Sequence, residues 1–130
     1  MKILLLAIAL LTCVFAVPAG ADNKGFAFIF ALSYATKEAY HVPVFEHPVK
    51  GKQFNDKEYV ADIKLIRKME DAFEQHLKTK MQLHNVRFTI TARTGFISEA
   101  VANGQLEAEK TNLKIQGIEM KSVLGFAFTP

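Results

Sequence analysis

An apolar stripe with helical spacing runs along the chain from Asn55 to about Met81. Its members recur every three or four residues, as they do on one buried face of a helix. Asn55 or Asp56 can cap the first turn, and Glu74 and Lys78 are spaced for an ion pair on the polar face. The pattern predicts one long amphipathic helix, whose buried positions are Tyr59, Ile63, Ile66, Met69, Phe73 and Leu77.

The segment from Gly25 to Tyr34 is apolar on both faces of a two-residue repeat. A strand with two apolar faces is covered on both sides, so this segment predicts a central strand, with a short helix as the alternative. Large side chains alternate with smaller ones along it, the former being Phe26, Phe28, Phe30 and Leu32.

Residues 35–52 interrupt this regularity with Pro43, Pro48 and Gly51. Proline breaks a helix, and because it has no backbone N–H it is confined to the edges of sheets. The segment is therefore expected to leave the core, with Tyr40 to Phe45 forming at most an edge strand.

After the helix, the apolar period becomes two. Apolar residues at Val86, Phe88, Ile90 and Ala92 alternate with arginine and threonine, which predicts a strand with one buried and one wet face. Thr94-Gly95 is then expected to form a turn into a second strand, Phe96 to Ala102.

Asn103-Gly104 is the strongest short hairpin signal in the chain. It predicts a type I′ turn into a third strand, with a bulge at Gly117 where the apolar phase changes. A helix over residues 105–114 is the alternative at this point. A last strand is expected from Val123 to Phe128, and its Gly-Phe-Ala-Phe repeats residues 25–28.

Together these elements predict an α+β fold in which one long amphipathic helix packs on an antiparallel sheet of four to five strands. One helix covers only part of such a sheet. The other face is then wet, or a second layer forms from residues 35–52 or 105–114. The polar positions of the strand at 86–93 favour the first alternative, in which the second face of the sheet is exposed to solvent.

The first 21 residues have the pattern of a secretory signal peptide. A basic Lys2 precedes an apolar run that is shorter than the roughly 20 residues of a membrane span, and Ala19-Gly20-Ala21 offers a cleavage site. Cleavage after Ala16 is a second acceptable site. We therefore expect a signal peptide at 1–21, a single secreted domain at 22–130, and no stable membrane insertion after cleavage.

Charge and cysteine content narrow the classes of function. The sixteen lysines and arginines and thirteen acidic residues give a formal net charge of +3 and are scattered along the chain, which argues against a nucleic-acid partner. The only cysteine, Cys13, lies in the predicted signal peptide. The secreted domain is thus expected to be free of disulfides and to rely on packing alone.

No catalytic signature stands out in the sequence. The serines after the signal, Ser33, Ser98 and Ser122, lie outside any Gly-x-Ser-x-Gly elbow, and no cysteine remains as a nucleophile. The sequence predicts a protein that is not an enzyme, with no catalytic residue and no bound cofactor.

The histidines and acidic residues are the remaining candidates for a site. His41, Glu46 and His47 carry donor atoms that zinc accepts, but their spacing is common by chance, and the two histidines are interpreted as surface residues. His76 and His84 are expected to point to solvent. The predicted helix also carries three neighbouring acidic residues, Glu70, Asp71 and Glu74, which are interpreted as part of its solvent-exposed face. We therefore predict no metal site.

The stretch from Tyr59 to Val101 resembles the middle of a SEA domain, an extracellular module. There a helix leads into a strand, a turn of the form Arg-x-Gly-Ser and an apolar strand, and here the matching residues are Arg93-Thr94-Gly95-Phe96. Because Phe96 replaces the serine that self-cleavage requires, the resemblance implies a member that does not cleave itself. It also implies a second helix at residues 105–114.

Two functions follow as hypotheses. The first is a secreted, non-enzymatic interaction or structural module whose protein partner is unknown. The second is an extracellular carrier of a small apolar ligand held between helix and sheet. The second rests on the surplus of phenylalanines able to line such a space, namely Phe26, Phe28, Phe30, Phe73, Phe88, Phe96, Phe126 and Phe128.

Overall fold

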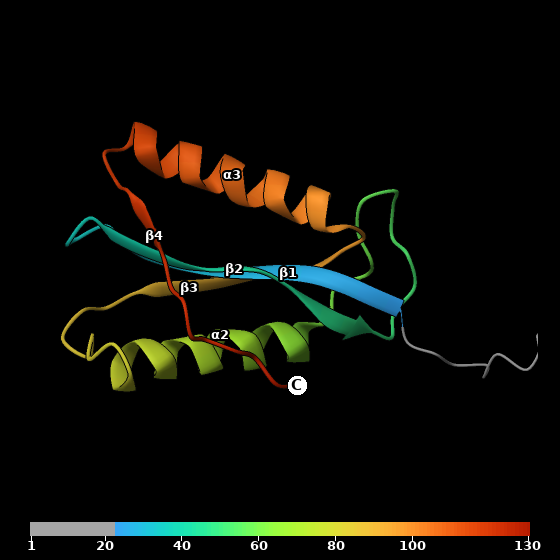
Figure 1. Cartoon of the computed structure of the whole chain (residues 1–130), viewed down its shortest axis with the longest axis horizontal. Helices are drawn as coiled ribbons and strands as arrows, with labels where there is room; N and C mark the ends of the chain where they lie inside the picture. Colours follow the sequence, from blue (N-terminus) through green and yellow to red (C-terminus); the bar gives the residue numbers. More distant parts are fainter. Residues whose placement is uncertain (1–22) are drawn as a thin grey trace, which may run out of the picture.

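A four-stranded mixed sheet lies between two helices in the computed structural model, which describes residues 23–130 (Figure 1). The predicted signal peptide and both of its cleavage sites lie outside the described residues. The sheet order is β3-β1-β2-β4, with β1 antiparallel to both neighbours and β4 parallel to β2. In chain order the elements are β1 (Asn23–Ser33), β2 (Glu38–Val49), α2 (Ile63–Thr79), β3 (Thr89–Phe96), α3 (Glu99–Ile115) and β4 (Met120–Ser122).

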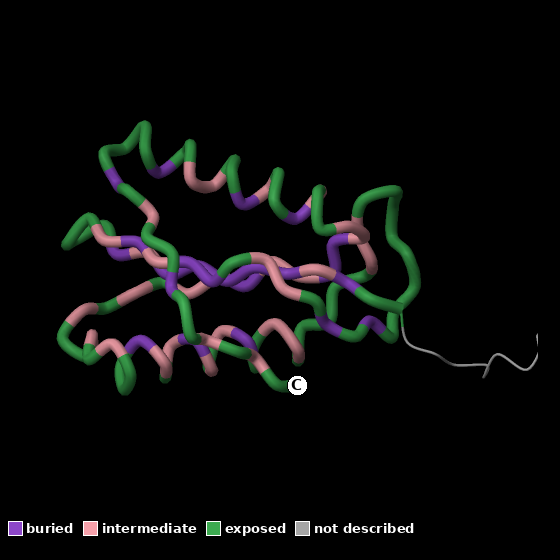
Figure 2. The backbone as a smooth tube through the Cα atoms, in the orientation of Figure 1, coloured by how far each residue is buried: buried purple, intermediate pink, exposed green. Residues whose placement is uncertain are grey.

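The predicted α+β class is confirmed, but two parts of the predicted architecture are wrong. The sheet is mixed instead of antiparallel, and a second helix, α3, covers the face that was expected to be wet. Buried residues are concentrated in the sheet and on the helix faces turned toward it (Figure 2). Residues 23–130 therefore form a three-layer sandwich with apolar clusters on both faces of the sheet.

Strand β1 is central, as its two apolar faces predict. On one face Ala27, Ile29 and Ala31 pack in a cluster with Met69 and Phe73 of α2. The opposite face carries the larger residues of the repeat and packs against α3, in a cluster of Phe28, Phe30, Phe96, Ala102 and Leu106. A strand with apolar side chains at every position needs both layers.

The hairpin predicted at Asn103-Gly104 is wrong, because both residues lie inside α3. Ser98 begins this helix: its hydroxyl oxygen accepts a hydrogen bond from the N–H of Val101 at 3.2 Å. Residues 105–114, for which a helix was the alternative, form its second half, so the predicted strands at 96–102 and 105–114 are wrong too.

Helix α2 keeps only part of the predicted apolar stripe, because it begins later than predicted: Tyr59 lies before the helix and Ile63 is exposed. Its N-cap is Asp62, which accepts a hydrogen bond from the N–H of Leu65 at 3.2 Å. The predicted cap Asn55 instead closes a loop, with its side-chain oxygen accepting from the N–H groups of Lys57 and Glu58 at 2.8 Å each. The middle and end of the stripe are confirmed: Met69, Phe73 and Leu77 are buried.

Residues 35–52 do not leave the core, because β2 occupies most of them. Pro43 and Pro48 are exposed, and they lie in the part of β2 that β4 does not cover, since the β2–β4 pairing is confined to residues 39–41. Along that stretch β2 is an edge strand, where a missing N–H is tolerated. The edge character was therefore predicted correctly, although the strand is much longer than expected.

The predicted turn at Thr94-Gly95 is also wrong. Both residues lie in β3, at a bulge where the β1–β3 register shifts between Phe26 and Phe28. Gly95 has a φ of 74°, a value that favours glycine and suits the bulge. The predicted phase of this strand is correct, because Ala92 is buried and Ile90 packs beside it.

The chain after β4 is an extended segment instead of the predicted last strand. Residues 123–130, which we call the C-terminal segment, cross the edge of the sheet toward α2 (Figure 1). The ring of Phe126 meets the ring of Phe73 edge-on at 5.4 Å, and Phe128 lies 6.4 Å from Phe45. The segment thus covers the α2 side of the core.

Candidate functional site

A buried histidine joins two strands that are not neighbours in the sheet. Nε2 of His47 on β2 accepts a hydrogen bond from the N–H of Gly95 on β3 at 3.0 Å, although β1 lies between these strands. The ring reaches across because Gly25, its partner in β1, has no side chain: a Cβ there would lie 3.0 Å from both Cε1 and Nε2 of His47.

This contact determines the tautomer of His47. Because Nε2 accepts, the proton is on Nδ1, which donates to the carbonyl oxygen of Pro48 at 3.1 Å. Burial lowers the pKa of the imidazole, while hydrogen bonds to the backbone of Pro48 and Phe26 and the charge of Asp62 act in the opposite direction. Neutral His47 is therefore a structural hydrogen-bonding residue at the end of the sheet.

Beside His47 lies an open hollow of about 680 Å³, which we call the α2 groove. It is formed where the end of β2, the start of α2 and the bulge of β3 meet. Its lining comprises residues 47–51, residues 60–65, Thr94, Gly95 and Pro130.

One wall of the α2 groove is mostly apolar and is accessible to solvent. Val60 and Ile63 are 52% and 58% exposed, whereas the large apolar residues of the four strands are all buried or half-buried. Pro48, Val49 and Ala61 add apolar lining. Exposed apolar side chains that cluster around a concavity are typical of a binding surface, whereas scattered single ones are not.

The loop that carries Val60 is held in place by backbone hydrogen bonds. The N–H of Val60 donates to the carbonyl oxygen of Lys52 at 2.8 Å, and the N–H of Tyr59 donates to the carbonyl oxygen of Gly95 at 2.8 Å. Nearer the start of the loop, the carbonyl oxygen of Lys57 accepts a hydrogen bond from the N–H of Ile97 at 2.9 Å. The wall is thereby anchored to the end of β3 and is preformed.

Charged side chains lie around the apolar wall. Lys50 and Lys64 line the groove, and Asp62 is the one acidic side chain among its lining residues. The carboxylate of Asp62 is engaged in capping α2, whose first N–H groups form the positive end of the helix dipole. The groove thus combines apolar surface with two ammonium groups that form no ion pair within residues 23–130.

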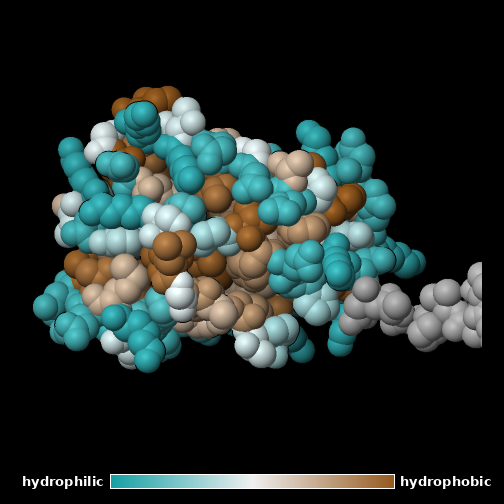
Figure 3. Space-filling model, in the orientation of Figure 1, coloured by the Kyte–Doolittle hydropathy of each residue, from teal (hydrophilic) through white to brown (hydrophobic). Residues whose placement is uncertain are grey.

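A second, smaller hollow of about 350 Å³ lies along the edge of β2. Its walls are residues 42–46 of β2 and residues 123–128 of the C-terminal segment. Figure 3 shows apolar side chains gathered over the middle of this face. Leu124, which lines the hollow, is 82% exposed. We call this hollow the β2-edge groove.

The structure separates the three residues that could have formed a zinc site. His41 and His47 are both buried and lie on opposite faces of the sheet, His41 beneath α3 and His47 beside the start of α2. Their interpretation as surface residues is wrong. Glu46 is exposed and lies 3.8 Å from the ammonium of Lys24. Within residues 23–130 no three potential ligand side chains gather at one point.

His41 is buried without a hydrogen-bond partner for Nδ1 in the described part of the chain. Burial lowers its pKa, and the charge of Lys110 on α3 acts in the same direction, whereas a backbone hydrogen bond at Val42 and the charge of Glu107 raise it. His41 is therefore neutral in the fold, like His47.

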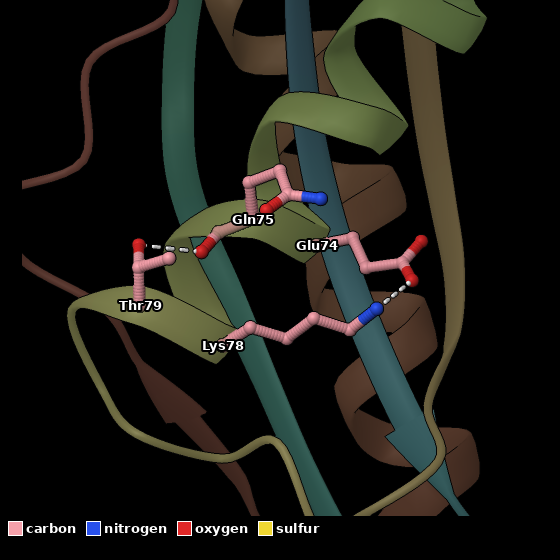
Figure 4. A network of polar contacts seen from close by, with 4 residues as sticks. All are labelled: Glu74, Gln75, Lys78 and Thr79. Atoms are coloured by element: carbon pink, nitrogen blue, oxygen red, sulfur yellow. Dashed lines mark hydrogen bonds and ion pairs between the residues drawn. The ribbon is translucent and has the colours of Figure 1, made fainter.

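The acidic residues of α2 have separate roles. The carboxylate of Glu70 accepts a hydrogen bond from the N–H of Ala92 on the outer edge of β3 at 3.2 Å, so this residue is not part of a solvated face. Asp71 is exposed, as predicted. The predicted ion pair between Glu74 and Lys78 is confirmed at 2.8 Å (Figure 4).

The two remaining histidines differ from each other. His84 is exposed, as predicted. His76 is half-buried, and its ring lies 5.2 Å from that of Phe126, so its predicted exposure is wrong. Neither contributes to the α2 groove.

The phenylalanines predicted as possible ligand lining are mostly core residues. Phe28, Phe73 and Phe96 are fully buried, and the rings of Phe28 and Phe96 stack at 6.0 Å. None of the eight predicted lining phenylalanines lines the α2 groove. Its apolar residues come instead from the loop before α2 and from the first turn of the helix.

No protein-family model matches the chain, and no curated protein or solved structure is significantly similar to it. Neither α2 nor α3, the helices of residues 23–130, has the apolar length needed to cross a membrane. The candidate site therefore rests on the geometry of the α2 groove.

Sequence reasoning missed this groove for a physical reason. Ile63 was predicted as a buried position of a helix starting at Asn55, and Val60 was not singled out by its spacing. Asp62 three residues before Leu65, after an irregular stretch, was the available signal for a later start. A helix beginning at Ile63 exposes its first turn at the end of the sheet.

Proposed function

We propose that this protein is a secreted, non-enzymatic binding module that engages its partner through the α2 groove. The observation that carries the proposal is the exposure of Val60 and Ile63, at 52% and 58%, on a preformed concave wall. Leaving two such side chains in water forgoes the free energy that burying them would contribute, and a partner recovers it by covering them.

Two kinds of partner fit this proposal. A protein partner would insert apolar side chains into the groove, as the interaction-module hypothesis expects. A small apolar ligand is the second candidate, favoured by the groove volume of about 680 Å³, which lies within the roughly 300–1,000 Å³ typical of small-molecule sites. The ligand would then lie at the end of the sheet, not between helix and sheet.

Export from the cytosol is part of the proposal and is supported by the pattern of the first 21 residues. Expression in a secreting host is expected to yield a product that starts at Asp22. N-terminal sequencing tests this, and a product that mostly retains Met1 would contradict it. The resemblance of residues 59–101 to SEA domains, which are extracellular modules, supports the same view.

Binding of a neutral apolar dye tests the proposed site. N-phenyl-1-naphthylamine is expected to increase in fluorescence with the protein, and the double variant Val60→Asn, Ile63→Asn is expected to lose most of that signal. Both positions are more than half exposed, so the fold should remain intact, and circular dichroism checks this.

A matched control is available at two other exposed apolar positions. Ile115 and Leu124 are 80% and 82% exposed and lie outside the α2 groove. Ile115→Asn with Leu124→Asn should leave dye binding unchanged. If the control pair abolishes binding and the groove pair does not, the α2 groove is not the binding surface.

A further inference from the structure

The α2 groove has a charge pattern as well as an apolar wall. Its lining contains two lysines, Lys50 just after β2 and Lys64 in the first turn of α2. Neither forms an ion pair among the salt bridges of residues 23–130. Two ammonium groups thus stand beside exposed apolar surface without a carboxylate partner.

The groove has only one acidic side chain, Asp62, against these two lysines. Asp62 directs Oδ1 to the N–H of Leu65, so its carboxylate offsets the positive end of α2. Nδ1–H of His47 donates a hydrogen bond to the carbonyl oxygen of Pro48, and Nε2 accepts one from the N–H of Gly95. The neutral ring therefore adds no charge to the groove. The side chains of the groove therefore leave an excess of positive charge.

We propose that the α2 groove binds a small amphiphile with a carboxylate head. The apolar tail lies against Val60 and Ile63, and the head lies between Lys50 and Lys64. This inference rests on the proposed function, because it specifies which ligand the same groove takes. Apolar contact provides most of the affinity, and the lysines provide the preference for an anion.

Three amphiphiles with the same tail and different heads test the inference: octanoate, 1-octanol and octyltrimethylammonium. Octanoate and octyltrimethylammonium are titrated below their micelle concentrations, and 1-octanol below its solubility limit, into the ¹⁵N-labelled secreted protein at pH 7.4, and amide shifts give the dissociation constants. Octanoate is expected to bind at least about threefold more tightly than 1-octanol, as two partly screened charge contacts allow. The shifts should fall on residues 47–51 and 60–65.

Variants identify the groups that set the preference. Lys50→Gln with Lys64→Gln should bring octanoate to the affinity of 1-octanol while leaving 1-octanol unchanged. Lys114→Gln with Lys121→Gln removes the same charge from exposed positions outside the groove and should keep the preference. Added salt should reduce the preference of the parent protein for octanoate, because exposed charges are screened.

The outcomes distinguish this inference from the proposed function. If all three amphiphiles bind the groove equally, the anion preference is wrong and the binding site stands. A preference for octyltrimethylammonium would mean that the carboxylate of Asp62 sets the charge preference of the groove, and would overturn the inference. If none of the three shifts the groove amides, the inference and the small-ligand form of the proposed function both fail.

Discussion

The imidazole of His47 occupies the place that a side chain on Gly25 would take. A Cβ at Gly25 would lie 3.0 Å from ring atoms Cε1 and Nε2 and 2.5 Å from Cγ2 of Val49. The missing side chain allows His47 to reach the N–H of Gly95 and hold the bulge of β3 that borders the α2 groove. One glycine in the central strand thus determines the geometry at this end of the sheet.

Gly25→Ala is therefore expected to destabilise the protein. The new methyl group must displace the His47 ring or the side chain of Val49, and overpacking of this kind costs about 1–3 kcal/mol. Urea denaturation of the parent and the variant measures the loss. A variant as stable as the parent would show that the ring of His47 does not lie over Gly25.

Gly104→Ala should have the opposite effect. Gly104 lies in the middle of α3 with open space around its missing Cβ, so alanine should stabilise the protein by about 0.5–1 kcal/mol through helix propensity. The same urea denaturation measures this gain. A clear loss of stability would favour a turn with positive φ at Asn103-Gly104, the conformation that the hairpin required.

Phe73→Ala is expected to cost about 3–5 kcal/mol, because its ring is fully buried between α2, the sheet and Phe126. Ile63→Ala on the same stripe is the control, since Ile63 is 58% exposed, and should change stability by no more than about 0.5 kcal/mol. Comparable losses for both would mean that the face of α2 turned toward the sheet is misassigned.

Stability should fall on mild acidification. The folded-state pKa values of His41 and His47 are lowered from the ordinary 6.5 mainly by burial, so the unfolded chain takes up protons first. Their contribution is complete above about pH 6.5 and is lost as the pH falls through the lowered folded-state values. Urea denaturation between pH 7.5 and 5.5 measures the slope.

Two histidine variants test which imidazole causes the pH dependence of stability. His47→Gln should be less stable at pH 7.5 but should show a weaker pH dependence, because one of the two buried imidazoles is gone. His84→Gln, at an exposed position, should keep the slope of the parent. An unchanged slope in His47→Gln would exclude His47 as its source.

The elements with a uniform apolar period could be predicted from the sequence. The two apolar faces of β1 and the positions Met69, Phe73 and Leu77 of α2 are where their spacing places them. Met69, Phe73, Leu77 and most apolar side chains of β1 are buried in the folded protein, so the need to cover apolar surface determined both the element and its facing.

The rest depended on tertiary context that local signals do not contain. Asn103-Gly104 favours a turn locally, but Ala102, Leu106 and Leu113 gain burial only when α3 continues through it. Pro43 is compatible with β2 because that stretch of the strand lies at an edge, which depends on where β4 pairs. The α2 groove was missed because it depends on the first residue of α2.

A neutral spin label tests the central claim most directly, because it maps accessible apolar surface without prior choice of a site. The nitroxide TEMPO is added to the ¹⁵N-labelled protein, and the broadening of each amide signal is measured. We expect the strongest broadening at residues 47–51 and 60–65, above that at Ile115 and Leu124, which are more exposed but lie outside the α2 groove. Broadening centred on the β2-edge groove, or equal at all exposed apolar positions, would contradict the account.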